Sequence, residues 1–141
     1  MPLDEEKITR FQAEIEDARK ILGEITSVTV DDFLRDPMKI RAMKYILIVI
    51  VEVICNLCRH ILAKHAHIVV EEYIEAIIKM QEKGIISEAV KNELVPLTKL
   101  RHQLIHGYWK TDDRRLFTET KDSLIIITKF GDEIRRFLQE Q

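Results

Sequence analysis

The segment Tyr45–Cys58 constrains the fold of this chain more than any other stretch. It is almost wholly apolar and rich in β-branched residues, a composition that strands also have. An uninterrupted apolar run of this length nevertheless favours a buried helix. The longest strictly apolar run, Tyr45–Val51, is far shorter than the ~20 residues that a membrane-spanning helix needs. We therefore expect a core helix from about Met38 to Lys64, in a protein that does not enter a membrane.

Three polar residues inside this expected helix lie along one narrow line. Glu52, Asn56 and Arg59 follow one another at spacings of four and three, which places them on the same side of a helix. Two interpretations are open. The line either faces solvent, or it borders a functional cleft or a subunit interface on a helix that is covered on all sides, since buried polar groups need partners.

The rest of the sequence also has the periodicity of helices. With only four glycines and three prolines, it contains few residues that separate short strands. Apolar residues recur at spacings of three and four, and the expected helices are Asp4–Ile25, a short one within Thr29–Asp36, Val70–Lys83, one from Ser87 that Pro96 kinks or restarts, and Arg115–Leu138. We expect an all-α protein, an up-and-down four- to five-helix bundle that forms a single domain over residues 1–141.

Charge is distributed unevenly along the chain. The net charge of −2 argues against a general nucleic-acid binder. Residues 1–36 carry five basic and ten acidic residues, net −5, whereas residues 96–115 carry five basic and two acidic residues, net +3. The N-terminus lacks the apolar stretch of a signal peptide. Cys55 and Cys58 lie in the apolar helix, and we expect them to be buried thiols rather than a redox or zinc site. A cytoplasmic location fits these features.

Chemically versatile side chains are concentrated in the segment Lys99–Trp109, which contains the run RHQLIHGYW. In a regular helix His106 points about 140° away from Arg101, so a continuous helix separates the two side chains. Two routes can still bring them together. The helix can end at about His106, with Gly107 as a left-handed cap, or each group can meet its counterpart from a second chain.

An arginine, a histidine and a tyrosine together suit phosphate chemistry. The planar fork of Arg101 can bind a phosphoryl oxygen, the imidazole of His106 can transfer a proton near neutral pH, and the phenol of Tyr108 can donate a hydrogen bond. A ribose 2′-hydroxyl needs no metal to attack its own 3′-phosphate. The structural alternative is that His106 and Tyr108 only cap the helix and pack beneath the loop that follows.

The pattern of Arg101, four residues, His106, Gly107 and Tyr108, preceded by an apolar helix, resembles the signature of the HepT-like members of the HEPN superfamily. These are all-α ribonucleases, usually found as toxins beside an MntA-type nucleotidyltransferase antitoxin. The resemblance implies a homodimeric, metal-independent endoribonuclease without a cofactor, acting on RNA by 2′-hydroxyl attack. It also implies that Arg101 binds the scissile phosphate, that His106 transfers the proton in a cleft shared by two chains, and that the antitoxin adenylylates Tyr108.

One position departs from the signature of these families. They usually carry a small polar residue, often Asn, directly after the arginine, and this chain has His102. His102 and His106 have a spacing that can hold a metal, but no acidic partner stands beside them, so we expect no metal. His102, Glu52 and Asn56 are expected to support the Arg101 and His106 pair. The rival hypothesis is a noncatalytic helical module that docks on, or presents substrate to, a nucleotidyltransferase.

Overall fold

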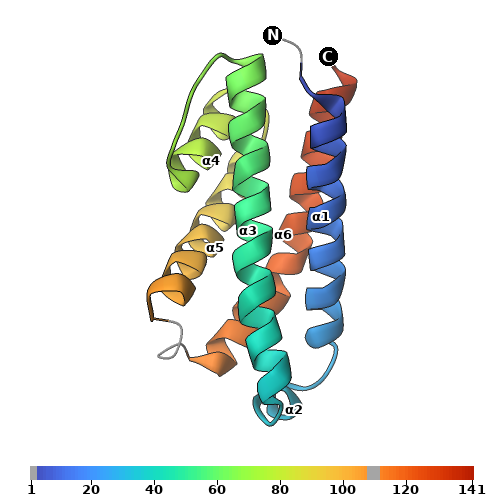
Figure 1. Ribbon diagram of the computed structural model, residues 1–141, viewed down its shortest axis with the longest axis vertical. Helices are drawn as coiled ribbons and strands as arrows, with labels where there is room; N and C mark the ends of the chain where they lie inside the picture. Colours follow the sequence, from blue (N-terminus) through green and yellow to red (C-terminus); the bar gives the residue numbers. More distant parts are fainter. Residues whose placement is uncertain (1–2, 108–111) are drawn as a thin grey trace.

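The computed structural model describes residues 3–107 and 112–141, and every regular element within them is a helix (Figure 1). In chain order these helices are α1 (Glu5–Ile25), α2 (Val30–Leu34), α3 (Pro37–His65), α4 (Tyr73–Glu82), α5 (Glu88–Gly107) and α6 (Asp113–Gln139). The four long helices α1, α3, α5 and α6 alternate in direction, while α2 joins α1 to α3 and α4 lies beside α3 and α5. The expected all-α, up-and-down architecture is confirmed.

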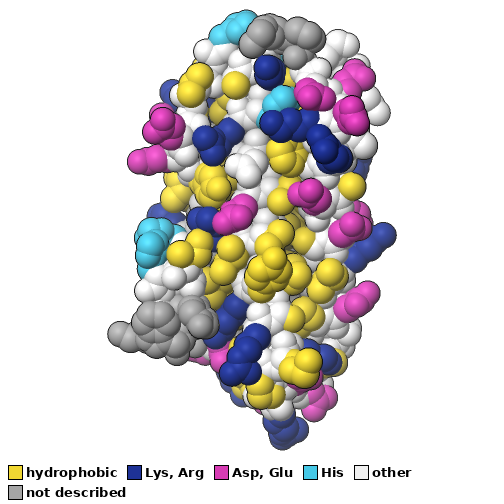
Figure 2. All heavy atoms as spheres, viewed as in Figure 1, with side chains coloured by type: hydrophobic (Ala, Val, Ile, Leu, Met, Phe, Trp, Pro, Cys, Tyr) yellow, Lys and Arg dark blue, Asp and Glu magenta, His cyan; other side chains and the backbone are white. Residues whose placement is uncertain are grey.

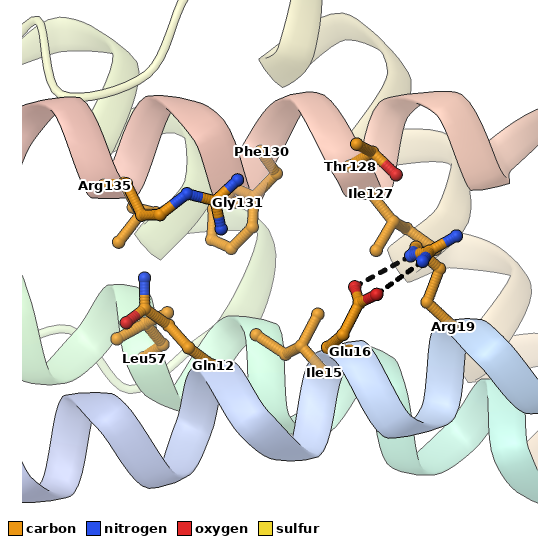
Figure 3. A pocket seen from close by; sticks show the side chains of 11 residues that line it. Gln12, Ile15, Glu16, Arg19, Leu57, Ile127, Thr128, Phe130, Gly131 and Arg135 are labelled. Atoms are coloured by element: carbon orange, nitrogen blue, oxygen red, sulfur yellow. Dashed lines mark hydrogen bonds and ion pairs between the residues drawn. The ribbon is translucent and has the colours of Figure 1, made fainter.

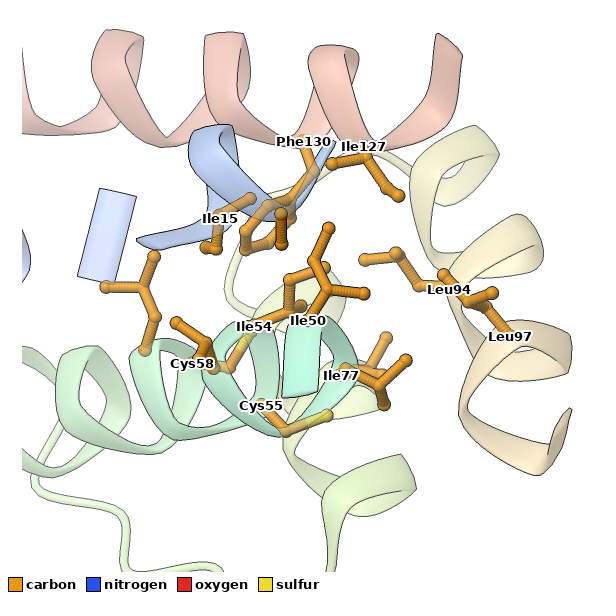
Figure 4. Packing of buried hydrophobic residues seen from close by; sticks show 14 of the residues in the cluster. Ile15, Ile50, Ile54, Cys55, Cys58, Ile77, Leu94, Leu97, Ile127 and Phe130 are labelled. Carbon is orange, nitrogen blue, oxygen red and sulfur yellow. The ribbon is translucent and has the colours of Figure 1, made fainter. Parts of the chain in front are cut away.

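The helix built from the apolar segment, α3, is the centre of the bundle. It contacts α1, α2, α4 and α5, and Figure 4 shows its Ile50, Ile54 and Cys55 facing side chains of the surrounding helices. The helix α3 is long and apolar enough to cross a membrane, but 56% of its most apolar 18-residue segment is buried inside the bundle. Core helices of soluble proteins have this same character.

The two cysteines of α3 are part of this core. Cys55 and Cys58 are both fully buried and carry free thiols. Burial raises the pKa of Cys55 to about 12 and raises the pKa of Cys58 well above its ordinary value, because a thiolate cannot be solvated there. The expectation of two buried thiols is confirmed.

Several helices begin where local capping residues predict. The side chains of Asp4, Thr29 and Asp36 each accept a hydrogen bond from the backbone N–H three residues further on, at 3.0, 3.1 and 3.2 Å. Pro37 then occupies the first turn of α3, where a missing N–H has no cost. Short-range hydrogen bonds of this kind set the starts of α1, α2 and α3.

The start of α4 differs from the sequence-based prediction. The helix begins at Tyr73, three residues after the expected Val70. The Arg59 side chain of α3 donates its Nε–H to the Val70 carbonyl at 2.8 Å, and Val70 itself is buried. This contact and the burial of Val70 hold residue 70 against α3, and α4 begins three residues later.

The end of α5 also differs from the prediction. The helix runs through Pro96 without a restart, with the buried Leu94 and Leu97 anchoring it on both sides of the proline. It includes Gly107 as its last residue, so the expected left-handed cap at this glycine is wrong. The fully buried Leu104 holds the last turn of α5 against the core.

One face of α3 is left uncovered by the helices of residues 3–107 and 112–141. Met38 and Tyr45 are 81% and 66% exposed, and Ile48 and Val49 are half-buried. Figure 2 shows hydrophobic side chains gathered over the middle of the view in which α3 lies in front. We call the surface formed by Met38, Tyr45, Ile48 and Val49 the open face of α3.

Candidate active site on α5

The motif residues lie on the C-terminal half of α5. Leu100 and Leu104 of this half are buried against the bundle, which fixes the rotation of the helix. That rotation leaves His102 and His106 exposed and Arg101 partly buried. Tyr108, the expected site of modification, lies outside the described residues, and so does Trp109.

Arg101 is held from two sides by residues of other helices. Its Nη2 donates a hydrogen bond to Oε1 of Glu52 on α3 at 2.6 Å, and its guanidinium carbon lies 4.8 Å from the centre of the Tyr73 ring on α4. The Arg101 side chain is only 17% exposed. Among the described residues its Nε–H has no partner. The arginine is therefore a fixed cation whose orientation is set by its neighbours on α3 and α4.

The two histidines of the motif form a pair on the outside of α5. The ring centres of His102 and His106 are 4.3 Å apart, with the planes tilted by 47°. Both rings line a pocket of about 530 Å³, which also includes Gly107 of α5 and Arg115 and Glu119 of α6. In the described part of the chain, no third His, Cys, Asp or Glu joins the pair to make a metal-ligand set.

Arg101 and His106 open onto different pockets. Arg101 lines a second pocket of about 830 Å³, between the beginning of α4 and the middle of α5. His102 and Gln103 line both pockets, so they form the boundary between them. Because α5 is continuous from Arg101 to Gly107, the route that relied on a helix break does not bring the two groups together in this chain.

The residues expected to support the site have different positions. Glu52 contacts Arg101 directly, whereas Asn56 is half-buried on the same line of α3 and makes no hydrogen bond with Arg101 or His106 among the described side chains. His102 contacts His106 through the ring pair. Of the polar line of α3, Arg59 therefore lines the pocket of Arg101 and Glu52 contacts Arg101 while its side chain stays 41% exposed.

Sequence reasoning missed Tyr73 and the place of Arg59. In the sequence Tyr73 is predicted only as an apolar position of an amphipathic helix, yet in the structure its ring lies against the Arg101 guanidinium. Arg59 ends the polar line of α3 and lines the same pocket as Arg101. The available signal was the spacing of seven between Glu52 and Arg59, which puts both on one side of α3.

A separate groove lies between α1 and α6, away from the motif (Figure 3). Its volume is about 230 Å³. Arg19 in this groove is paired with Glu16 and lowers the pKa of that carboxyl group, and Arg135 is paired with Asp132. These arginines already have acidic partners, so the groove has less unpaired charge to offer a ligand than the pocket beside Arg101.

Comparisons with known proteins agree with this architecture. A family model described as "Ribonuclease HepT-like" matches residues 14–140. No curated protein matches the chain. The solved structure of the cytosolic protein YutE from Bacillus subtilis, described as of unknown function, has a TM-score of 0.83 at 19% identity and covers 98% of this chain and 92% of its own. A structure described as a toxin-antitoxin with AMP-PNP has a TM-score of 0.74 at 15% identity, covering 91% of this chain and 97% of its own.

Proposed function

This chain belongs to the HepT-like ribonuclease family of the HEPN superfamily, and we propose that it is a metal-independent endoribonuclease, the toxin of a toxin–antitoxin pair, with its site at a homodimer interface. The observation that carries the proposal is the arrangement of Arg101 and His106 on α5. The first is a fixed, partly buried cation and the second an exposed imidazole, and each lines a pocket. Membership of the family supports RNA cleavage as the reaction, and a fixed cation beside an exposed imidazole suits phosphate binding and proton transfer.

In this proposal the Arg101 guanidinium binds a nonbridging oxygen of the scissile phosphate. Its contact with Glu52 orients the fork, so the arginine loses little freedom when the phosphate binds. His106 takes the proton from the ribose 2′-hydroxyl or gives one to the leaving oxygen. The 2′-oxygen forms a bond to phosphorus while the bond from phosphorus to the 5′-oxygen breaks. The products are a 2′,3′-cyclic phosphate and a 5′-hydroxyl end.

A second copy of this chain would complete the site. The open face of α3 leads from Tyr45 to Glu52, which holds Arg101. Ile105, one turn after Arg101 on α5, is 41% exposed and adds an exposed apolar side chain within the motif itself. Burial of this surface against a second copy would remove apolar area from water and could bring the arginine of one chain near the histidine of the other.

The test is RNA cleavage by the wild type, Arg101→Ala and His106→Ala. Each variant alone should lose activity. After denaturation and refolding of the two variants together, half of the dimers are mixed, and each has one intact shared site, so about a quarter of the wild-type rate should return. Equal activity of all three proteins removes the proposed chemistry. Inactive single variants without recovery in the mixture remove the shared site.

The remaining parts of the proposal concern metal, partner and location. Cleavage should be unchanged in excess EDTA, because the proton and phosphate contacts come from side chains alone. We propose an MntA-type nucleotidyltransferase as the antitoxin; the structure described as a toxin-antitoxin supports an antitoxin partner. That enzyme with ATP should add adenylyl groups to the peptide bearing Tyr108, which mass spectrometry detects. A cytoplasmic location is in keeping with the cytosolic description of YutE.

A further inference from the structure

The pocket beside Arg101 extends well beyond the motif. Its volume of about 830 Å³ lies in the upper part of the range for sites that hold small molecules. Three helices line it, with Arg59 from α3, Tyr73 from α4, and Lys99 and Gln103 from α5. A single phosphate on Arg101 fills only a small part of this space, so the pocket has room for the nucleotide chain on one side of that phosphate.

Two cations in this pocket are without an acidic partner in the part of the chain that the structure describes. Neither Arg59 nor Lys99 forms an ion pair with a carboxylate of the described residues, whereas Arg101 is paired with Glu52. Arg59 donates only its Nε–H to the Val70 carbonyl, and Lys99 is exposed on α5. Their positive charges are therefore available to an anionic ligand.

The positions of these cations fit a chain of phosphates rather than one anion. Arg59 follows Glu52 by seven residues on α3, which places it roughly 10 Å further along the helix axis than the residue that holds Arg101. Lys99, two residues before Arg101 on α5, projects from another side of that helix and lines both this pocket and the neighbouring groove between α5 and α6. The cations are thus distributed along the pocket, as successive phosphates require.

The remaining lining favours an unpaired strand over a duplex. The exposed amide of Gln103 can hydrogen-bond a base edge, and Tyr73 and Ile74 provide apolar wall. Duplex RNA instead needs a broad surface that crosses successive minor grooves. Glu71 and Glu72 also line the pocket and are exposed, so their negative charges repel a polyanion unless the cations of the pocket bind it.

We propose, on the basis of the function proposed above, that this pocket is the subsite for the single-stranded RNA that flanks the scissile phosphate, with Arg59 and Lys99 as its phosphate-binding residues. The two side chains act on binding of the strand, and Arg101 and His106 act on the reacting phosphate. Arg59 and Lys99 should therefore affect KM and leave kcat largely unchanged.

The test measures binding without cleavage. A fluorescein-labelled single strand of fully 2′-O-methylated RNA lacks the nucleophile, and its anisotropy is followed with the full-length wild type, Arg59→Gln and Lys99→Gln. Each variant should raise Kd roughly 3- to 10-fold and reduce the slope of log K against log salt by about 0.7. Matched controls are Arg10→Gln on α1 and Lys121→Gln on α6, both exposed and outside this pocket. The opposite change, Glu72→Gln, should tighten binding.

The outcomes separate the pocket from the catalytic proposal. Unchanged Kd in Lys99→Gln, which removes no structural contact, overturns the subsite even if the wild type cleaves RNA. Equal affinity for a methylated duplex of the same length overturns the assignment to single strands. Absence of RNA cleavage by the wild type overturns the proposed function instead, and loss of binding in Arg59→Gln and Lys99→Gln but not in the controls would still support an RNA subsite.

Discussion

The ion pair between Glu52 and Arg101 should stabilise the folded chain by an amount that its burial sets. Exposed ion pairs contribute about 0.2–1 kcal/mol, and removal of one member of a fully buried pair costs about 3–5 kcal/mol. The Glu52 and Arg101 side chains are 41% and 17% exposed, with 2.6 Å between Oε1 and Nη2. This pair lies between the two limits, so we expect a coupling free energy of about 1–2 kcal/mol.

A double-mutant cycle isolates this coupling. The free energy of unfolding is measured in urea, at one protein concentration, for the wild type, Glu52→Gln, Arg101→Gln and the double variant. The matched control is the same cycle on Arg115 and Glu119, an exposed pair one turn apart on α6, which should give about 0.3–0.5 kcal/mol. A coupling for Glu52 and Arg101 no larger than the control would refute the claim that α3 holds the arginine in place.

Three further predictions concern the core and the ends of helices. Cys55 and Cys58 should resist aromatic disulfide reagents in the folded protein and react only as fast as it opens, because burial raises both pKa values. Burial and Lys7 lower the pKa of His60, so the folded state binds a proton at this residue less readily than the unfolded state. The free energy of unfolding should therefore be highest above about pH 6.5 and decrease as the pH is lowered below it. The variant His60→Gln should show a weaker dependence on pH. Gly84→Ala should destabilise by about 1 kcal/mol, since its φ of 71° disfavours a side chain.

Each of these predictions has an outcome that contradicts it. Rapid labelling of both thiols in a protein with a native circular dichroism spectrum would show that they are accessible. An unaltered pH profile in His60→Gln would show that another group causes the dependence. For Gly84→Ala, the control is Gly23→Ala inside α1, where a Cβ meets nothing within 4 Å and helix propensity predicts stabilisation. Equal effects of the two substitutions would remove the argument from φ.

Much of the fold was predictable because its causes are local. The apolar segment around Ile50 and Ile54 predicted the central helix, and the capping side chains of Asp4 and Thr29 marked helix starts, since they bond backbone groups only three residues away. The start of α4 was not predictable in this way. Val70 instead packs against α3, where its carbonyl accepts a hydrogen bond from Arg59, and this tertiary contact has no counterpart in the apolar periodicity of the segment.

The features of the candidate site also separate into those with local causes and those that depend on tertiary contacts. The sequence alone determined which helix carries Arg101 and His106, and that a regular helix directs them apart, because helix geometry sets the angle between side chains. Only the tertiary structure decided that Glu52 and Tyr73 hold the arginine, and that the two motif residues open onto separate pockets. The contact between Arg101 and Glu52 joins residues 49 positions apart, and no periodicity along the chain specifies which helices become neighbours.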